Sequence, residues 1–260
     1  MLARSLFVYS VTFCHDERTT SMYKRIILKL SGETLAPEKV SSENASHSFE
    51  ATRVDRAAKV IADLADMGVQ VGVVMGGGNI WRGRFTDAMN PVLADQMGML
   101  ATIINALCVQ DALQRMGRKA TVFTAQEMTR FAELYRADRV MAALERGEIA
   151  LLAGGSGNPF FTTDTAAALR AAELGADAVF KGTTVDGVYD SDPRKNPDAK
   201  LIRDITYRET IERGLKVMDT SAFQLCLDQR IPVIRIFNMD DLDNVLRVAR
   251  GEAIGTVVHL

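Results

Sequence analysis

The sequence predicts an α/β domain built as a three-layer αβα sandwich around a largely parallel central sheet. Apolar, β-branched segments alternate with segments of helical hydrophobic spacing along almost the whole chain, which is typical of parallel strands joined by helices. Two of the apolar segments run directly into glycine-rich turns, as strands do where open α/β sheets bind ligands. The 260 residues are 47% hydrophobic and 25% charged, which provides ample core for such a domain.

The composition also argues against several classes of function. The formal net charge is -2, so no basic excess favours nucleic acid, and no polybasic segment favours a membrane. The cysteines Cys14, Cys108 and Cys226 are widely spaced and match neither a disulfide framework nor a metal site, which predicts a reducing cytoplasm. The histidines form no metal-ligand spacing either, and we expect no resident metal site.

Residues 1–21 are expected to stand apart from the domain. The segment Leu6–Phe13 is apolar, but it is short and lacks the small-residue cleavage site of a signal peptide. Met22 leads directly into a strong strand. We therefore expect either a disordered extension or an upstream start codon with Met22 as the natural start, and one domain over residues 22–260.

The first part of this domain is predicted to be a strand–helix–strand unit. Arg25–Leu30 has the pattern of a strand, apolar residues from Val54 to Ala65 recur at helical spacing, and Val69–Met75 has the pattern of a buried strand. Such a unit implies a parallel pair with a right-handed crossover. Residues 35–51 show no apolar period and are expected to form a mobile loop.

A glycine triplet after the second strand is the first candidate ligand loop. Gly76, Gly77 and Gly78 carry no Cβ, so a ligand can approach their backbone closely and their N–H groups can turn toward an anion. Arg82 follows and can grip a phosphate with its planar fork. The segment is not a P-loop, and it is not the dinucleotide fingerprint because position 81 is Trp. A tight strand-to-helix turn that is merely rich in glycine is the alternative.

The remaining chain is predicted to continue the alternation of helices and strands. Further strands are expected at Ala120–Thr124, Ile149–Ala153, Ala178–Lys181, Val233–Phe237 and Thr256–Val258. Further helices are expected at Val92–Met116, Arg136–Arg146, Thr163–Leu174, Tyr207–Arg213, Ser221–Gln229 and Asp241–Arg250. An Asp-Gly turn predicts a hairpin at Val185–Tyr189.

The second candidate ligand loop, Gly154–Asp164, follows a predicted strand and opens a predicted helix. Phe160 and Phe161 stand there between polar residues and can shape a flat slot for a base. An N-capped helix with a hydrophobic staple is the alternative interpretation.

Charged candidates accompany these loops. Lys29 and Lys181 end predicted strands, although an edge-strand lysine that deters aggregation is an alternative for Lys29. Asp95 either complements a helix dipole or binds ligand hydroxyls. Asp219 is either a helix N-cap, which the residues alone favour, or a carboxylate aimed at the site. Two lysines, an arginine and two glycine loops suit a polyphosphate, and phosphoryl transfer requires mainly positioning and charge neutralisation.

Six motifs in order make the chain resemble the bacterial uridylate kinases of the amino-acid kinase superfamily. They are Leu28–Glu33, Gly76–Gly83, Asp95–Thr102, Gly157–Asp164, Val185–Tyr189 and Lys216–Asp219. The resemblance implies the amino-acid kinase fold and transfer of the ATP γ-phosphoryl group to UMP, in pyrimidine nucleotide (CTP) biosynthesis, with Mg²⁺ carried by ATP. It also implies a cytoplasmic homohexamer that GTP activates and UTP inhibits, with no need for nucleic acid or membrane.

The resemblance further implies roles for individual residues. Lys29 would neutralise the transferring phosphoryl group, Arg82 would hold phosphate oxygens, and Asp219 would orient Lys29 without acting as a base. The catalytic set would be Lys29, Arg82, Lys181 and Asp219. The ATP-binding set would be Lys29, Leu30, Ser31, Gly32, Gly78, Arg82, Thr183, Tyr189 and Asp192. The UMP-binding set would be Gly77, Asp95, Ser156, Gly157, Asn158, Pro159, Phe160, Phe161, Thr162 and Thr163.

Two other functions remain open. One is a different phosphotransferase of the superfamily, acting on a carboxylate, a carbamate or an isoprenoid phosphate. The Asp95 motif and the Asn-Pro-Phe-Phe-Thr-Thr segment argue against that function. The other is a non-catalytic nucleotide sensor on the same fold, against which the presence of Lys29 and Asp219 argues.

Overall fold

The protein is described here by a computed structural model, which covers residues 21–37, 48–83 and 89–260. Residues 1–20, for which an extension or an upstream start was predicted, lie outside the described residues, as do residues 38–47 of the predicted loop. Met22 already belongs to the folded domain, because its N–H donates to Ala249 O at 3.0 Å.

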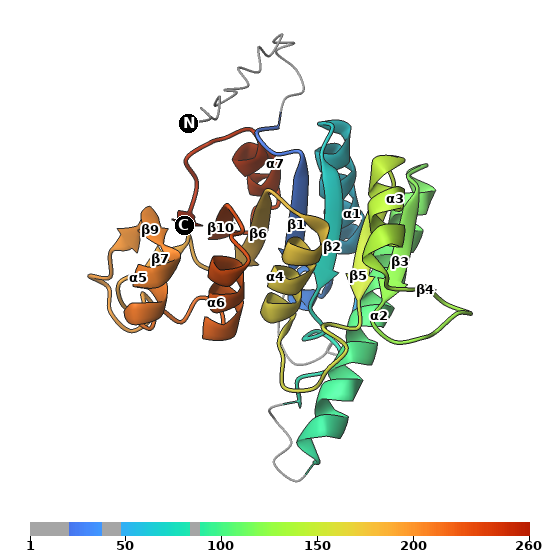
Figure 1. The fold of residues 1–260 in the computed structure, drawn as a ribbon, viewed down its shortest axis with the longest axis horizontal. Helices are drawn as coiled ribbons and strands as arrows, with labels where there is room; N and C mark the ends of the chain where they lie inside the picture. Colours follow the sequence, from blue (N-terminus) through green and yellow to red (C-terminus); the bar gives the residue numbers. More distant parts are fainter. Residues whose placement is uncertain (1–20, 38–47, 84–88) are drawn as a thin grey trace, which may run out of the picture.

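A nine-stranded sheet forms the middle layer of the described residues (Figure 1), in the order β4-β3-β5-β2-β1-β6-β10-β11-β9. Every pairing in it is parallel except that of β10 with β11. The strands are β1 Arg25–Leu30, β2 Gln70–Met75, β3 Ala120–Thr124, β4 Glu133–Leu134, β5 Ile149–Ala153, β6 Ala178–Thr183, β9 Asp204–Thr206, β10 Val233–Asn238 and β11 Thr256–His259. A separate pair is formed by β7 Val188–Tyr189 and β8 Leu201–Ile202.

Helices cover both faces of this sheet (Figure 1), which confirms the predicted three-layer sandwich. The helices α1 Ala51–Asp66, α2 Pro91–Arg115 and α7 Asn244–Ala249 pack on one face. The helices α3 Ala137–Glu145, α4 Thr163–Leu174, α5 Tyr207–Glu212 and α6 Thr220–Asp228 pack on the other. A short 3₁₀ helix, η1 Gly32–Leu35, follows β1. Because β1, β2 and β5 are covered on both sides, their almost uninterrupted apolar sequences are buried.

Local sequence explains where the two helices nearest the site begin. The Asn90 side chain accepts a hydrogen bond from Val92 N at 2.9 Å, and Pro91 occupies the first turn of α2, where no N–H is needed. The Thr162 side chain accepts from Asp164 N at 3.1 Å and starts α4. Gly175 ends α4 in the left-handed conformation, with φ +58°.

The predicted hairpin at Val185–Tyr189 is wrong. Residues 184–187 form bends, and β7 pairs instead with β8, which lies beyond the next loop. The cause is a tertiary contact, because Val188 N donates to Thr256 Oγ1 at 2.8 Å and Gly187 packs closely against Thr256. Val188 N thus binds Thr256 of β11 and not a residue across a local Asp-Gly turn.

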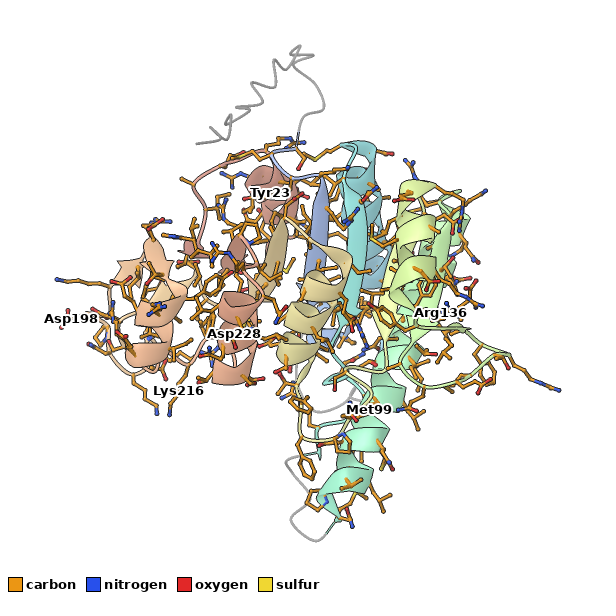
Figure 2. All side chains as sticks on the ribbon, in the orientation of Figure 1. Tyr23, Met99, Arg136, Asp198, Lys216 and Asp228 are labelled. Carbon is orange, nitrogen blue, oxygen red and sulfur yellow. The ribbon has the colours of Figure 1, made fainter. Side chains whose placement is uncertain are left out.

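The direction of the strands determines at which end of the sheet the candidate residues lie. Figure 2 shows Tyr23, just before β1, at one end of the sheet, and Met99 of α2 at the other. The carboxyl ends of β1, β2 and β5 lie at the Met99 end, and Figure 1 shows α2 extending beyond the sheet there. Both glycine-rich loops therefore leave the sheet at the same edge.

Candidate active site

Two lysines meet in the centre of the sheet. The register of β1 with β6 places Lys29 directly beside Lys181. Like charges on neighbouring strands repel, so this pair requires an anion. Asp164, in the first turn of α4, supplies it: Lys29 Nζ lies 3.0 Å from Asp164 Oδ1, and Lys181 Nζ pairs with Asp164 Oδ2. The side chains of Lys29, Lys181 and Asp164 are 13%, 8% and 13% exposed. We call these three residues the lysine–aspartate triad.

The triad carries one net positive charge when all its members are ionised. Burial by itself raises the pKa of Asp164, but the two ammonium groups outweigh it, so the pKa lies below the usual value. Burial and the neighbouring charge of Lys29 lower the pKa of Lys181, which Asp164 partly offsets. The N-terminus of α4 adds partial positive charge. The triad therefore provides an electropositive spot, mostly shielded from solvent, that suits a phosphoryl group.

Asp219 lies beside the triad. It occupies the N-cap position of α6, but its side chain makes no capping hydrogen bond, so the favoured interpretation as a cap is wrong for the side chain. It accepts hydrogen bonds from Thr162 Oγ1 and, at 3.5 Å, from Thr165 Oγ1 at the start of α4. The carboxylate in contact with both lysines, among the described residues, is that of Asp164. The negative charge of Asp219 acts on Lys181 from further away and offsets a small part of the lowering of the Lys181 pKa.

The first glycine loop is fixed between β1 and α2. Gly76 N donates to Leu30 O at 2.8 Å, which continues the pairing of β2 with β1 past the strand end. Gly77 packs against α2 so closely that a Cβ would meet Ala101 Cβ and Gly98 O, each at 2.9 Å. Glycine is therefore required at position 77 by packing alone.

Gly77→Ala is expected to lower the free energy of unfolding by about 1–3 kcal/mol, because the backbone must shift to admit the methyl group. Thermal unfolding followed by circular dichroism measures the loss. Gly78→Ala is the matched control, since the nearest atom to its Cβ would be Arg82 Nε at 3.6 Å, an ordinary contact. Equal melting temperatures for the two variants would contradict the packing argument.

Arg82 follows the glycine triplet and binds both this loop and η1. Its Nε donates to Gly78 O at 2.9 Å, and its guanidinium pairs with Glu33 of η1. The Arg82 side chain is 36% exposed, so part of the fork faces solvent at the strand ends.

A pocket of about 150 Å³ lies between the two glycine loops and α2. It is lined by Gly77, Trp81, Gly83, Ala94, Asp95, Gly98, Met99, Thr102, Gly155, Ser156, Phe161, Thr162 and Thr163. Six residues of the expected UMP-binding set are among them: Gly77, Asp95, Ser156, Phe161, Thr162 and Thr163. A larger hollow of about 530 Å³ between α5 and α6 contains none of the candidate residues, so volume alone does not identify the site.

The second glycine loop is held against α2 by Asp95. The carboxylate Oδ2 of Asp95 accepts a hydrogen bond from Phe160 N at 2.7 Å. Asp95 lies beyond the first turn of α2, so complementing the helix dipole does not explain it. Phe160 adopts φ +71°, which is unusual for a bulky residue, and its side chain is 74% exposed. Of the two adjacent phenylalanines, Phe161 lines the pocket, whereas the exposed Phe160 is not among its lining residues.

Four of the residues expected to contact ATP lie at the ends of β1 and β6 or in and after β7. Ser31 caps η1, and Thr183 ends β6, which is two residues longer than predicted. Tyr189 lies in β7, where its hydroxyl donates to Asp186 at 3.4 Å, and Asp192 follows in the next loop. Because β6 and β2 flank β1 on opposite sides, Thr183 at the end of β6 and the glycine triplet after β2 are separated by the end of β1.

Comparison with known proteins identifies the family. A family model described as the amino acid kinase family matches residues 24–238. The chain belongs to the amino acid kinase family. It is 46% identical over 239 residues to a uridylate kinase of Bacteroides thetaiotaomicron, which covers 91% of this chain and 98% of that protein.

Solved structures agree with this membership of the amino acid kinase family. A UMP kinase from Bacillus anthracis superimposes with a TM-score of 0.85 at 35% identity, over 91% of this chain and 96% of that one. A UMP kinase from Ureaplasma parvum gives a TM-score of 0.82 at 34% identity, over 94% and 100%. The predicted fold and the resemblance to uridylate kinases are thereby confirmed.

Three polar residues of this amino acid kinase site were not singled out from the sequence. Asp164 ended one of the recognised motifs, but only the register of β1 and β6 reveals the two lysines that it joins. Thr102 ended another, and Asn105 lies inside the long helix that was predicted from its apolar residues. What marks Asn105 as unusual is the burial of its polar side chain, which only the folded structure reveals.

Proposed function

We propose that this chain is a UMP kinase, which transfers the γ-phosphoryl group of ATP to UMP and yields ADP and UDP. The observation that carries the proposal is the buried lysine–aspartate triad next to the pocket that six residues of the expected UMP-binding set line. The 46% identity to a uridylate kinase supports the choice of substrate. In a cell, the enzyme would act in the cytoplasm, in the pyrimidine pathway that leads to CTP.

The proposed chemistry needs no base. The attacking oxygen of the UMP phosphate is already anionic, so Asp219 has no proton to remove. The protein instead has to bring two anions together and offset the negative charge that they concentrate. Lys29, Lys181 and the N-terminus of α4 supply fixed positive charge at that point, and Arg82 binds phosphate oxygens from the loop side. Asp164 keeps the two ammonium groups together and aimed at the strand ends.

UMP would occupy the pocket beside α2. Asp95 would accept hydrogen bonds from the ribose hydroxyls, because a carboxylate can accept several and Phe160 N uses only one. Residues 156–163 would surround the ribose and uracil, with Gly157, Asn158, Pro159 and Phe160 contributing backbone groups. Gly77 would face the UMP phosphate.

ATP would lie on the opposite side of the triad. Leu30, Ser31, Gly32 and Gly78 would receive its phosphates. Thr183, Tyr189 and Asp192 would contact the nucleoside.

Mg²⁺ would bind as a complex with ATP. Within the described parts of the chain, no three His, Cys, Asp or Glu side chains come together in a way that could hold a metal ion. Asp164 is committed to the two lysines, so the donor set suits an ion held chiefly by phosphate oxygens. The ion would supply further charge neutralisation.

A panel of phosphoryl acceptors tests the function. With ATP and Mg²⁺, ADP release should be fastest with UMP, slower with CMP and at background with aspartate or acetylglutamate. Preference for a carboxylate would favour a different phosphotransferase, and UMP binding without turnover would favour a nucleotide sensor. Repeating the UMP assay with GTP and with UTP tests the proposed activation and inhibition.

Assembly into a homohexamer belongs to the same proposal. One face of α2 exposes Leu93, Met97, Leu100 and Ile104, which follow one another at helical spacing, and a second copy of the chain would cover it. By length and apolar composition alone, α2 is also a candidate membrane span. Its other face packs against the sheet, which favours a protein partner.

Leu100→Glu with Ile104→Glu is expected to yield a smaller species, because two charges would then be buried between subunits. Size-exclusion chromatography with light scattering measures the mass. Leu260→Glu, also at an exposed apolar residue, is the control and should keep the native mass. An unchanged mass for the double variant would argue against assembly through α2.

A further inference from the structure

The inner face of α2 contains two buried polar side chains in an otherwise apolar surface. Thr102 and Asn105 are 3% and 0% exposed, and they lie three residues apart, on the same side of the helix. Neither residue type favours a helix interior, and a buried polar atom lowers stability unless it is hydrogen-bonded. Their partners therefore indicate what they do.

Thr102 holds the second glycine loop. Its hydroxyl donates to Met99 O at 2.7 Å, within the helix, and accepts from Gly154 N at 2.8 Å. Gly154 is the first residue after β5 and adopts φ +78°, so the chain turns there from the sheet into the loop. Without the hydroxyl, a buried N–H at this turn would lose its partner.

Asn105 holds the first glycine loop. Its Nδ2 donates to Gly76 O at 2.6 Å and to Asn79 Oδ1 at 2.8 Å. Its Oδ1 accepts from Asn79 Nδ2 at 3.0 Å, so the two amides bind each other reciprocally. Asn105 thus binds Gly76, the first residue of the triplet, and Asn79, the residue that follows the triplet.

We propose that Thr102 and Asn105 are positioning residues that mount the two glycine loops on one turn of α2 and fix the distance between them. The inference rests on the proposed function, in which UMP binds between these loops. Thr102 acts on the loop that surrounds the ribose and uracil, whereas Asn105 acts on the loop that faces the phosphates. Loss of each side chain should therefore affect a different kinetic parameter.

Steady-state kinetics of the full chain test the part played by Thr102. Thr102→Val keeps the shape but cannot accept the Gly154 hydrogen bond, and it should raise KM for UMP about tenfold while changing KM for ATP less than about twofold. Thr102→Ser restores the acceptor and should restore KM. Thr210→Val is the control, since Thr210 is 1% exposed and donates to Thr206 O at 2.8 Å, on α5. This variant should match the unmodified chain.

Asn105→Asp tests the other loop. The new carboxylate cannot donate to Gly76 O, so the phosphate-facing loop should shift and kcat should fall about 10- to 100-fold, with a smaller change in KM for UMP. Circular dichroism first checks that each variant is folded, and Thr102→Ala replaces Thr102→Val if the latter is not.

Either of two results would overturn the inference: native kinetics for Thr102→Val, or equal changes in both KM values that serine does not reverse. If the unmodified chain itself fails to phosphorylate UMP, the proposed function falls instead. The two failures are therefore distinguishable.

Discussion

Lys29→Ala is expected to lower kcat for UMP phosphorylation by about 10²- to 10³-fold, with a much smaller change in KM for either nucleotide. Lys29 is paired with Asp164 within the triad, and in the proposed mechanism its ammonium group would stand where charge accumulates during transfer. A fixed charge at that point stabilises the transition state more than it stabilises the bound substrates. Initial rates at saturating and limiting UMP separate the two parameters.

The structure offers a matched control for this experiment. Lys59→Ala removes a lysine whose side chain is 65% exposed and paired with Asp63 one turn along α1. Its kcat should be native. Near-native turnover by Lys29→Ala would rule out the charge-neutralising role, and a large rise in KM with unchanged kcat would assign Lys29 to binding alone.

Asp164→Asn is expected to lower the free energy of unfolding by about 3–5 kcal/mol at neutral pH, because two adjacent buried ammonium groups would lose their shared counter-ion. The pKa of Lys181, already lowered by burial and by Lys29, should fall further. Urea unfolding gives the free energy. The rate should also fall, since the lysines would no longer be held together.

The pH dependence gives this prediction a second readout. The pKa of Asp164 in the folded chain lies below its ordinary value, so its ionised form stabilises the fold at any pH above the unfolded pKa of about 3.9. That contribution disappears as the pH falls through the folded pKa. The difference between the native chain and Asp164→Asn should therefore be largest near neutrality and shrink in acid.

Asp111→Asn is the control, because Asp111 is 71% exposed and pairs with Arg115 one turn along α2. Its effect should stay below about 0.5 kcal/mol. Equal losses of unfolding free energy for Asp164→Asn and Asp111→Asn would show that the triad contributes no more stability than a surface ion pair.

The parts of the fold that depend on local sequence were predictable. The bounds of β3, β5 and α4 agree with those expected, because buried apolar runs and capping residues such as Thr162 and Gly175 mark them. The two-residue strands β4, β7 and β8 are too short to show a hydrophobic period. The hairpin expected at Val185–Tyr189 was wrong because Thr256, distant in the sequence, binds Val188 N.

The candidate site, too, could be predicted only in part. Lys29, Lys181 and both glycine loops could be placed at one sheet edge from the rule that parallel strands end together. The direction of the Asp219 side chain could not be predicted, because it depends on a hydrogen bond from Thr162, which lies far away in the sequence. The bridging position of Asp164 depends on strand register, which a single sequence does not reveal.

Trp81 lines the pocket between the glycine loops, where its Nε1 donates to Ala94 O at 2.9 Å, and the chain contains 1 tryptophan. The tryptophan fluorescence of the protein therefore originates beside the proposed UMP site. A titration with UMP can follow its emission directly, without any attached dye, and can give a dissociation constant in the absence of turnover. The same signal would separate ligand occupancy from chemistry in every variant proposed above.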